Sequence, residues 1–154
     1  MKSLCVLVAT LVILCLGGSV AEDDVFGIYL LRYDGFTEMD GDQWRAHGHG
    51  DFKLRENELK HRGSDGSVLT TIRTTLNRPL DPFRLPQSRT ATGSIRSLDF
   101  DTGRVSRGDM RFQFTIYEDD DDRIWLSGSY EVDWTGGPHR GAYSWGVMDG
   151  KLQE

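Results

Sequence analysis

Apolar and polar residues alternate at every second position through much of the chain beyond its first 21 residues. The clearest run covers residues 110–117, and one of its faces carries Met110, Phe112, Phe114 and Ile116. A period of two is typical of a β-strand with one buried face and one solvated face. No stretch beyond residue 21 keeps the apolar period of 3.6 residues that an amphipathic helix needs. The alternation therefore predicts an all-β fold.

A second alternating run follows the first after a short acidic loop, residues 118–122. Its expected buried face carries Ile124, Leu126, Tyr130, Val132 and Trp134. Two such runs around a short polar loop predict an antiparallel hairpin.

Weaker alternation and β-branched composition predict further strands. They cover residues 26–33, 44–54, 68–76, 92–100, 104–110 and 143–147. In two of these runs large aromatic residues fall on the face expected to be buried, namely Trp44 in one and Tyr143 and Trp145 in the other. Together with the hairpin, these runs amount to about eight strands.

About eight short strands between turn signals predict a single antiparallel β-barrel, with a β-sandwich as the alternative. Most connections are short, and glycines inside strands, such as Gly48 and Gly50, allow the sharp bends that barrels need. Residues 77–91 are the exception, because three prolines prevent this segment from joining a central ladder. Its apolar residues predict a loop that packs over one end of the barrel.

This architecture resembles lipocalin-like (calycin) barrels and allene-oxide-cyclase-like barrels. The glycine-x-tryptophan signature of lipocalins is not met, because in Gly41–Trp44 the tryptophan stands one residue too late. The resemblance therefore concerns architecture, and architecture alone does not specify a function.

The first 21 residues predict a secretory signal peptide. Lys2 precedes an apolar run of about 13 residues, and Ser19 and Ala21 provide small residues at the two positions that a signal peptidase inspects. The run is shorter than the roughly 20 apolar residues of a transmembrane helix. We therefore expect a signal peptide at residues 1–21, a single all-β domain at residues 22–154, and a secreted or periplasmic protein without stable membrane insertion after cleavage.

Cysteine content and charge restrict the chemistry of this domain. Cys5 and Cys15 both lie in the predicted signal, so the rest of the chain has no thiol for a disulfide, a metal or a nucleophile. The chain carries 24 acidic and 18 basic residues, a formal charge of −6 that becomes −7 when Lys2 is removed. An acidic surface argues against nucleic acid as a partner. No nucleophile elbow, zinc-protease motif or phosphate loop is found, so no cofactor is expected and an enzyme is the less favoured class.

Two histidines form the candidate metal site. His47 and His49 are two residues apart on one predicted strand and so project from the same face, with His61 or His139 available as a third ligand. The alternative interpretation is an ordinary polar strand face, because Arg45 lies on that face as well and repels a cation.

Two other short motifs have simple interpretations. The acidic residues 118–122 lack the spaced oxygen ligands and the glycine of a calcium loop, and are interpreted as a solvated turn. Arg107-Gly108-Asp109 spells the tripeptide that integrin-binding proteins present on loops, and is predicted to form an exposed turn between two strands.

Aromatic residues supply most of the candidate ligand-binding positions. Trp44, Trp134 and Trp145 fit inward positions, whereas Trp125 shares a face with serines and Glu131 and is the best candidate for an exposed contact. A basic residue near the rim could meet an anionic group of a ligand. The predicted ligand-binding residues are Trp125, Trp44, Trp134, Trp145, Tyr143 and Arg140.

The preferred function is a non-enzymatic binding domain for a small apolar ligand, a glycan or a protein partner. One alternative is a structural or interaction protein of an envelope or extracellular matrix, with its outer face as the contact surface. The other is a barrel enzyme that uses His47 and His49 for metal or acid–base chemistry.

Overall fold

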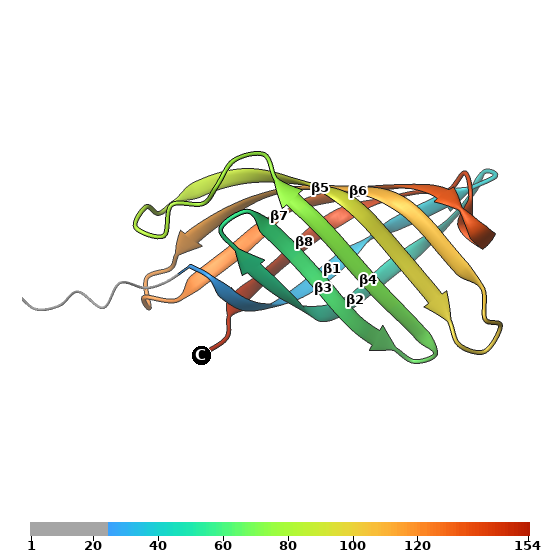
Figure 1. The fold of residues 1–154 in the computed structure, drawn as a ribbon, viewed down its shortest axis with the longest axis horizontal. Coiled ribbons are helices and arrows are strands. Elements are labelled where there is room, and N and C mark those ends of the chain that lie inside the picture. The colour runs from blue at the N-terminus through green and yellow to red at the C-terminus, as the bar shows by residue number, and fades with distance from the viewer. Residues whose placement is uncertain (1–24) are drawn as a thin grey trace, which may run out of the picture.

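Eight antiparallel strands close into a barrel in the computed structural model, which describes residues 25–154 (Figure 1). Each strand pairs with its neighbours in the chain, and pairing of the first with the last closes the barrel. The strands are β1 (Gly27–Met39), β2 (Asp42–Arg55), β3 (Glu58–Asp65), β4 (Val68–Leu76), β5 (Gln87–Asp99), β6 (Val105–Glu118), β7 (Ile124–Gly136) and β8 (Tyr143–Leu152). The predicted antiparallel β-barrel is therefore confirmed, and the sandwich alternative is not.

The predicted signal peptide, residues 1–21, lies outside the described residues, as do both cysteines. Within residues 25–154, no helix has the length and apolar character needed to span a membrane.

Several observed strands are longer than predicted, and two differences go beyond their bounds. The two strands predicted at residues 104–110 and 110–117 form one continuous strand, β6, which begins at Val105, and β3 was not predicted. The alternation of β3 is weak because its inward positions after Leu59 are His61, Gly63 and Asp65. The tripeptide at residues 107–109 is not a turn, because it lies inside β6 with Gly108 buried.

One end of the barrel is filled by apolar side chains. This end holds the first described residues, the C-terminus and the β4–β5 connection (Figure 1). Leu80 of that connection is 3% exposed and joins the core cluster, so the connection covers a barrel end as predicted. It is shorter than the predicted loop of residues 77–91, because residues 87–91 belong to β5 and pair with β4 and β6. Its backbone N–H donates to the carbonyl of Glu56 at 2.9 Å, which ties the loop to the β2–β3 turn. The largest fully buried side chains of the core include Tyr29, Leu31, Leu54, Leu59, Phe112, Ile116 and Leu126.

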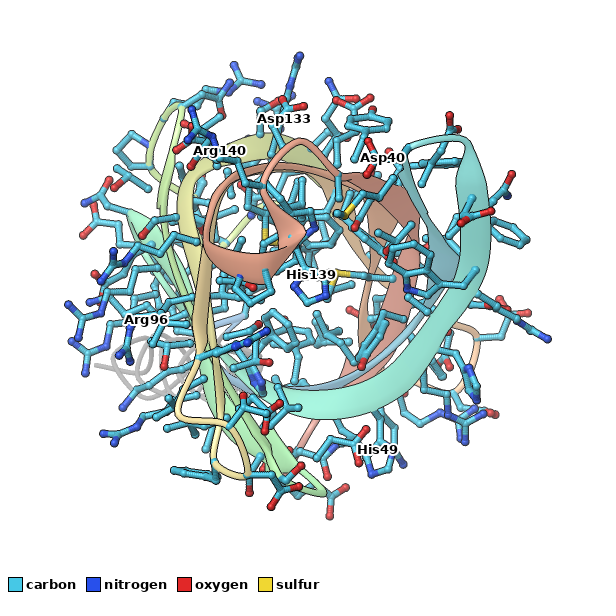
Figure 2. All side chains as sticks on the ribbon, turned by 90° about the vertical axis from the view of Figure 1, so that its right-hand side faces the viewer. Asp40, His49, Arg96, Asp133, His139 and Arg140 are labelled. Carbon is cyan, nitrogen blue, oxygen red and sulfur yellow. The ribbon has the colours of Figure 1, made fainter. Side chains whose placement is uncertain are left out.

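The opposite end carries a short 3-10 helix, η2 (Gly137–His139), between β7 and β8. Viewed along the barrel, His139 lies over the opening (Figure 2). Its Nδ1 is 2.7 Å from Oγ of Ser106, and its ring centroid is 5.4 Å from that of Trp134. The helix therefore partly covers this end of the barrel.

The inward face of β8 is the reverse of the one predicted. Ser144, Gly146 and Met148 point inward, whereas Tyr143 and Trp145 point outward. The reason is the close approach of neighbouring strands, since a Cβ added to Gly146 would lie 2.6 Å from Cα of its partner Gly35. Only small residues fit at such positions, so here the large residues occupy the outer face.

Candidate ligand cavity in the barrel lumen

The half of the barrel nearer to η2 is hollow. A cavity of about 540 Å³ occupies it, within the range of roughly 300–1,000 Å³ typical of small-molecule sites. Its wall is largely apolar, and the apolar side chains that line it include Phe52, Ile72, Ile95, Met110, Val132 and Met148. The cavity can therefore accept an apolar molecule of modest size.

The cavity opens through the side of the barrel, between β2 and β3. These strands pair over only four residues each, from Phe52↔His61 to Arg55↔Glu58, whereas β1 and β2 pair along the whole length of β1. Beyond His61 the two strands separate. The outward-facing residues His49 and Arg62 consequently line the cavity together with the lumen residues. This gap between the strands is the mouth of the site.

His61 lies where β2 and β3 separate. Its ring stacks on Phe52 with a centroid distance of 4.6 Å, and its Nδ1 is 2.8 Å from the backbone carbonyl of Asp51. The ring fits because its neighbours on both strands are glycines. A Cβ added to Gly50 or Gly63 would lie 2.6 or 2.8 Å from its Cε1.

Two tyrosines provide hydroxyl groups at the cavity, Tyr33 on β1 and Tyr130 on β7. Each depends on a facing glycine, because a Cβ at Gly48 would lie 2.7 Å from Cζ of Tyr33, and one at Gly35 would lie 2.6 Å from the Tyr130 hydroxyl. Within the described residues, neither hydroxyl forms a hydrogen bond to another protein group. Both are therefore available to a ligand.

The surroundings of these tyrosines keep them neutral. Burial raises the pKa of Tyr33, and the carboxylate of Asp65 raises it further. Burial also raises the pKa of Tyr130, to about 12, with smaller contributions from Tyr33 and Asp34. Both phenols are consequently protonated near neutral pH, and each can donate or accept a hydrogen bond.

A buried chain of hydrogen bonds fixes one wall of the cavity. The Trp134 indole N–H donates to Oγ of Ser144 at 2.8 Å, and that hydroxyl lies 2.7 Å from Oγ1 of Thr37. Ser144 and Thr37 are only 5% and 6% exposed. The chain links β7, β8 and β1 and fixes the orientation of the Trp134 ring at the cavity.

Of the six predicted ligand-binding residues, the structure places Trp134 in the cavity wall. Trp44 is on the lumen side of β2 by register, opposite Thr37, but it is 42% exposed and does not line the cavity. Arg140 is exposed at the periphery of the barrel end, away from the opening (Figure 2).

The other three predicted residues lie on the outer face of the barrel. Trp125 is half-buried there, and its indole N–H donates to Oδ2 of Asp119 at 2.7 Å. Tyr143 and Trp145 stack with a centroid distance of 5.5 Å, and Phe36 lies 6.1 Å from Trp145. We call the rings of Phe36, Tyr143 and Trp145 the outer aromatic cluster.

The two candidate metal ligands, His47 and His49, share a face of β2 as expected, and that face is the exposed outer one. In the portion of the chain that the structure describes, no group of three or more His, Cys, Asp or Glu residues is placed to hold a metal ion.

In the acidic loop, Asp119 accepts hydrogen bonds from the backbone N–H groups of Asp121 and Arg123. This carboxylate organises the turn itself.

Sequence reasoning did not identify Tyr33, Asp65 and Tyr130 as polar residues of the cavity, and it named His61 only as a possible metal ligand. A usable signal was present in the glycines at alternate positions of β2, Gly48 and Gly50. Inward glycines on one strand leave room for rings from its neighbours. They can therefore indicate where polar aromatic groups enter a lumen.

The fold and the cavity together define a β-barrel with one filled end and one hollow end. A scan against protein-family models gives no match for the chain, and a search of curated proteins gives none.

Proposed function

We propose that this protein is a non-enzymatic barrel that binds a small, predominantly apolar molecule in its lumen. The observation that supports this most is the division of the interior into a filled half and a hollow half of about 540 Å³. Transfer of an apolar ligand from water into such a cavity is favourable, by about 0.8 kcal/mol for each CH₂ group that is buried. The phenol groups and the fixed Trp134 indole give such a ligand a defined orientation.

The test uses N-phenyl-1-naphthylamine, a neutral dye that fluoresces in apolar surroundings. We expect saturable binding of one dye per chain. Ala46 lines the cavity from β2, so Ala46→Phe should place a ring in the lumen and weaken dye binding at least tenfold. The matched control is Thr92→Phe, which adds a ring on the outer face of β5 and should leave binding unchanged.

Two results would overturn this proposal. One is the absence of saturable dye fluorescence with the folded protein. The other is an Ala46→Phe variant that keeps its β-sheet circular dichroism spectrum and binds the dye as tightly as the parent chain.

We also propose that binding takes place outside the cytoplasm, in a secreted or periplasmic protein. The support is the charged start, the apolar run and the small residues at Ser19 and Ala21. Intact-mass analysis of the exported protein should give a chain that starts at Glu22. A product that retains residues 1–21 would contradict export by cleavage.

A second candidate function is glycan binding through the outer aromatic cluster. Phe36 and Tyr143 are 41% and 37% exposed, and Glu131 and Asp133 are the direct β7 partners of Trp145 and Tyr143. Flat rings can stack on the apolar face of a sugar, and flanking carboxylates can accept hydrogen bonds from its hydroxyls.

Electrophoresis in gels that contain a soluble polysaccharide tests this second candidate. Retardation that Trp145→Ala abolishes and Ala46→Phe preserves would assign the glycan to the outer face. Equal mobility with and without polysaccharide, across a panel of neutral and acidic glycans, would rule it out.

A further inference from the structure

We infer that the lumen prefers a cationic amphiphile, with a protonated amine at Asp65 and the two phenols and an apolar body deeper in the barrel. This inference rests on the proposed binding function and specifies the chemistry of its ligand. It depends on the arrangement of charged and hydrogen-bonding groups around a cavity whose remaining wall is apolar.

Asp65 is the carboxylate on the lumen side of the cavity. It is the last residue of β3, and strand alternation puts it on the same face as His61 and Gly63. All three residues line the cavity. Within residues 25–154 the Asp65 carboxylate has no ion pair or hydrogen bond to a protein group. It is therefore free to pair with a cation that enters through the mouth.

The phenol groups complement this carboxylate. Besides burial, the Asp65 carboxylate raises the pKa of Tyr33, and Tyr33 likewise adds to the effect of burial on the pKa of Tyr130. The carboxylate and the two phenols therefore interact electrostatically at the cavity. A protonated amine has three donors and no acceptor, so it can donate to a carboxylate and to two phenol oxygens at once. The surroundings that oppose a tyrosinate also oppose a ligand carboxylate.

The other titratable groups at the cavity do not reverse this preference. They are His49, Asp51, His61 and Arg62, in addition to the tyrosines and Asp65. Arg62 is the only lysine or arginine among the residues that line the cavity, and it belongs to the exposed outer face of β3. The formal charge of the chain, −6, also favours the approach of a cation.

Three eight-carbon probes that differ only in their polar group test the effect of that group on binding: octylamine, 1-octanol and octanoate. Each is measured at neutral pH by displacement of N-phenyl-1-naphthylamine and by isothermal titration. We expect octylamine to bind most tightly and octanoate least. Asp65→Asn should weaken octylamine about fivefold, the size expected for an ion pair at a solvent-accessible site, and should leave 1-octanol unchanged.

The matched control is Asp109→Asn, which removes the same charge from the exposed outer face of β6 and should change none of the three affinities. If no probe binds and the dye does not bind, the proposed function fails. If 1-octanol binds but octylamine has no advantage, or octanoate binds most tightly, only the present inference is overturned. Equal losses of octylamine and 1-octanol in Asp65→Asn would also overturn it.

Discussion

Gly50 on β2 and His61 on β3 lie together where these two strands separate, and the ring of His61 occupies the space that a side chain at Gly50 would need. The three nearest atoms to a Cβ at Gly50 all belong to the His61 ring, the first at 2.6 Å. The ring stacks on Phe52, and a Cβ at Gly63 would also approach its Cε1 atom, at 2.8 Å. Gly50, together with Gly63 on β3, therefore leaves the space that the His61 ring occupies at the cavity mouth.

The first prediction concerns this pair. Gly50→Ala should lower the free energy of unfolding by about 1–3 kcal/mol, because it displaces His61 from its stack and from the Asp51 carbonyl. Urea denaturation measures the change. In a His61→Ala background the added methyl group no longer meets the ring, so the same substitution should cost less than about 0.5 kcal/mol. Equal costs in the two backgrounds would show that the ring is not the cause.

The second prediction concerns Ser144, the shared partner in the buried hydrogen-bond chain. Ser144→Ala leaves the Trp134 indole N–H and the Thr37 hydroxyl without their partner. An unsatisfied buried polar group costs about 1–3 kcal/mol, so we expect a loss of stability in that range. Ser129→Ala is the control on the exposed face of β7 and should change stability by less than about 0.5 kcal/mol. A similar small effect at both serines would contradict the structural role of Ser144.

The fold could be predicted from sequence wherever the barrel interior is filled. In β6 and β7, large apolar residues at alternate positions meet similar residues across the core, so the hairpin and its buried face follow from periodicity. The strand β3 could not be predicted in this way. Around a hollow lumen its inward positions hold His61, Gly63 and Asp65, so the usual contrast between an apolar and a polar face is lost.

The site was harder to predict than the fold because the size of a side chain does not determine which face it occupies. In β8 the inward positions must be small where β1 approaches closely, so Trp145 is on the outside and Gly146 on the inside. In such a strand, periodicity separates the two faces but does not tell which of them is inward. The cavity residues come from strands distant in sequence, and only strand register brings Tyr33, Asp65 and Tyr130 to one cavity.

The third prediction concerns the loop that closes the filled end. Leu80 is 3% exposed in the core cluster, whereas Phe83 of the same loop is 72% exposed. Leu80→Ala should therefore lower the free energy of unfolding by about 2–4 kcal/mol through lost burial and a residual cavity. Phe83→Ala, although it removes a larger side chain, should change it by less than about 0.5 kcal/mol. Thermal and urea unfolding of the two variants provide the comparison, and equal effects would mean that the loop does not seal the barrel.

The acidic turn between β6 and β7 contains a carboxylate with an unusually low pKa. Partial burial of Asp119 works against its charge, but hydrogen bonds from the Arg123 backbone, the Trp125 indole and the Asp121 backbone outweigh this effect. The pKa of Asp119 consequently falls to about 2 from the ordinary value of 3.8. A lowered pKa in the folded state means that the charged turn contributes stability above the ordinary value, and that this contribution is lost as the pH falls through about 2.

The fourth prediction follows from that sign. The emission of Trp125, taken as the difference between the parent protein and Trp125→Phe, should stay constant from neutral pH to about pH 4. It should then change with a midpoint near 2, as Asp119 takes up a proton and the indole loses its 2.7 Å partner. Asp119→Asn should abolish the step, because an amide in this position does not titrate. A step that persists in Asp119→Asn, or a midpoint near 3.8, would show that the turn hydrogen bonds do not hold the carboxylate in its charged form.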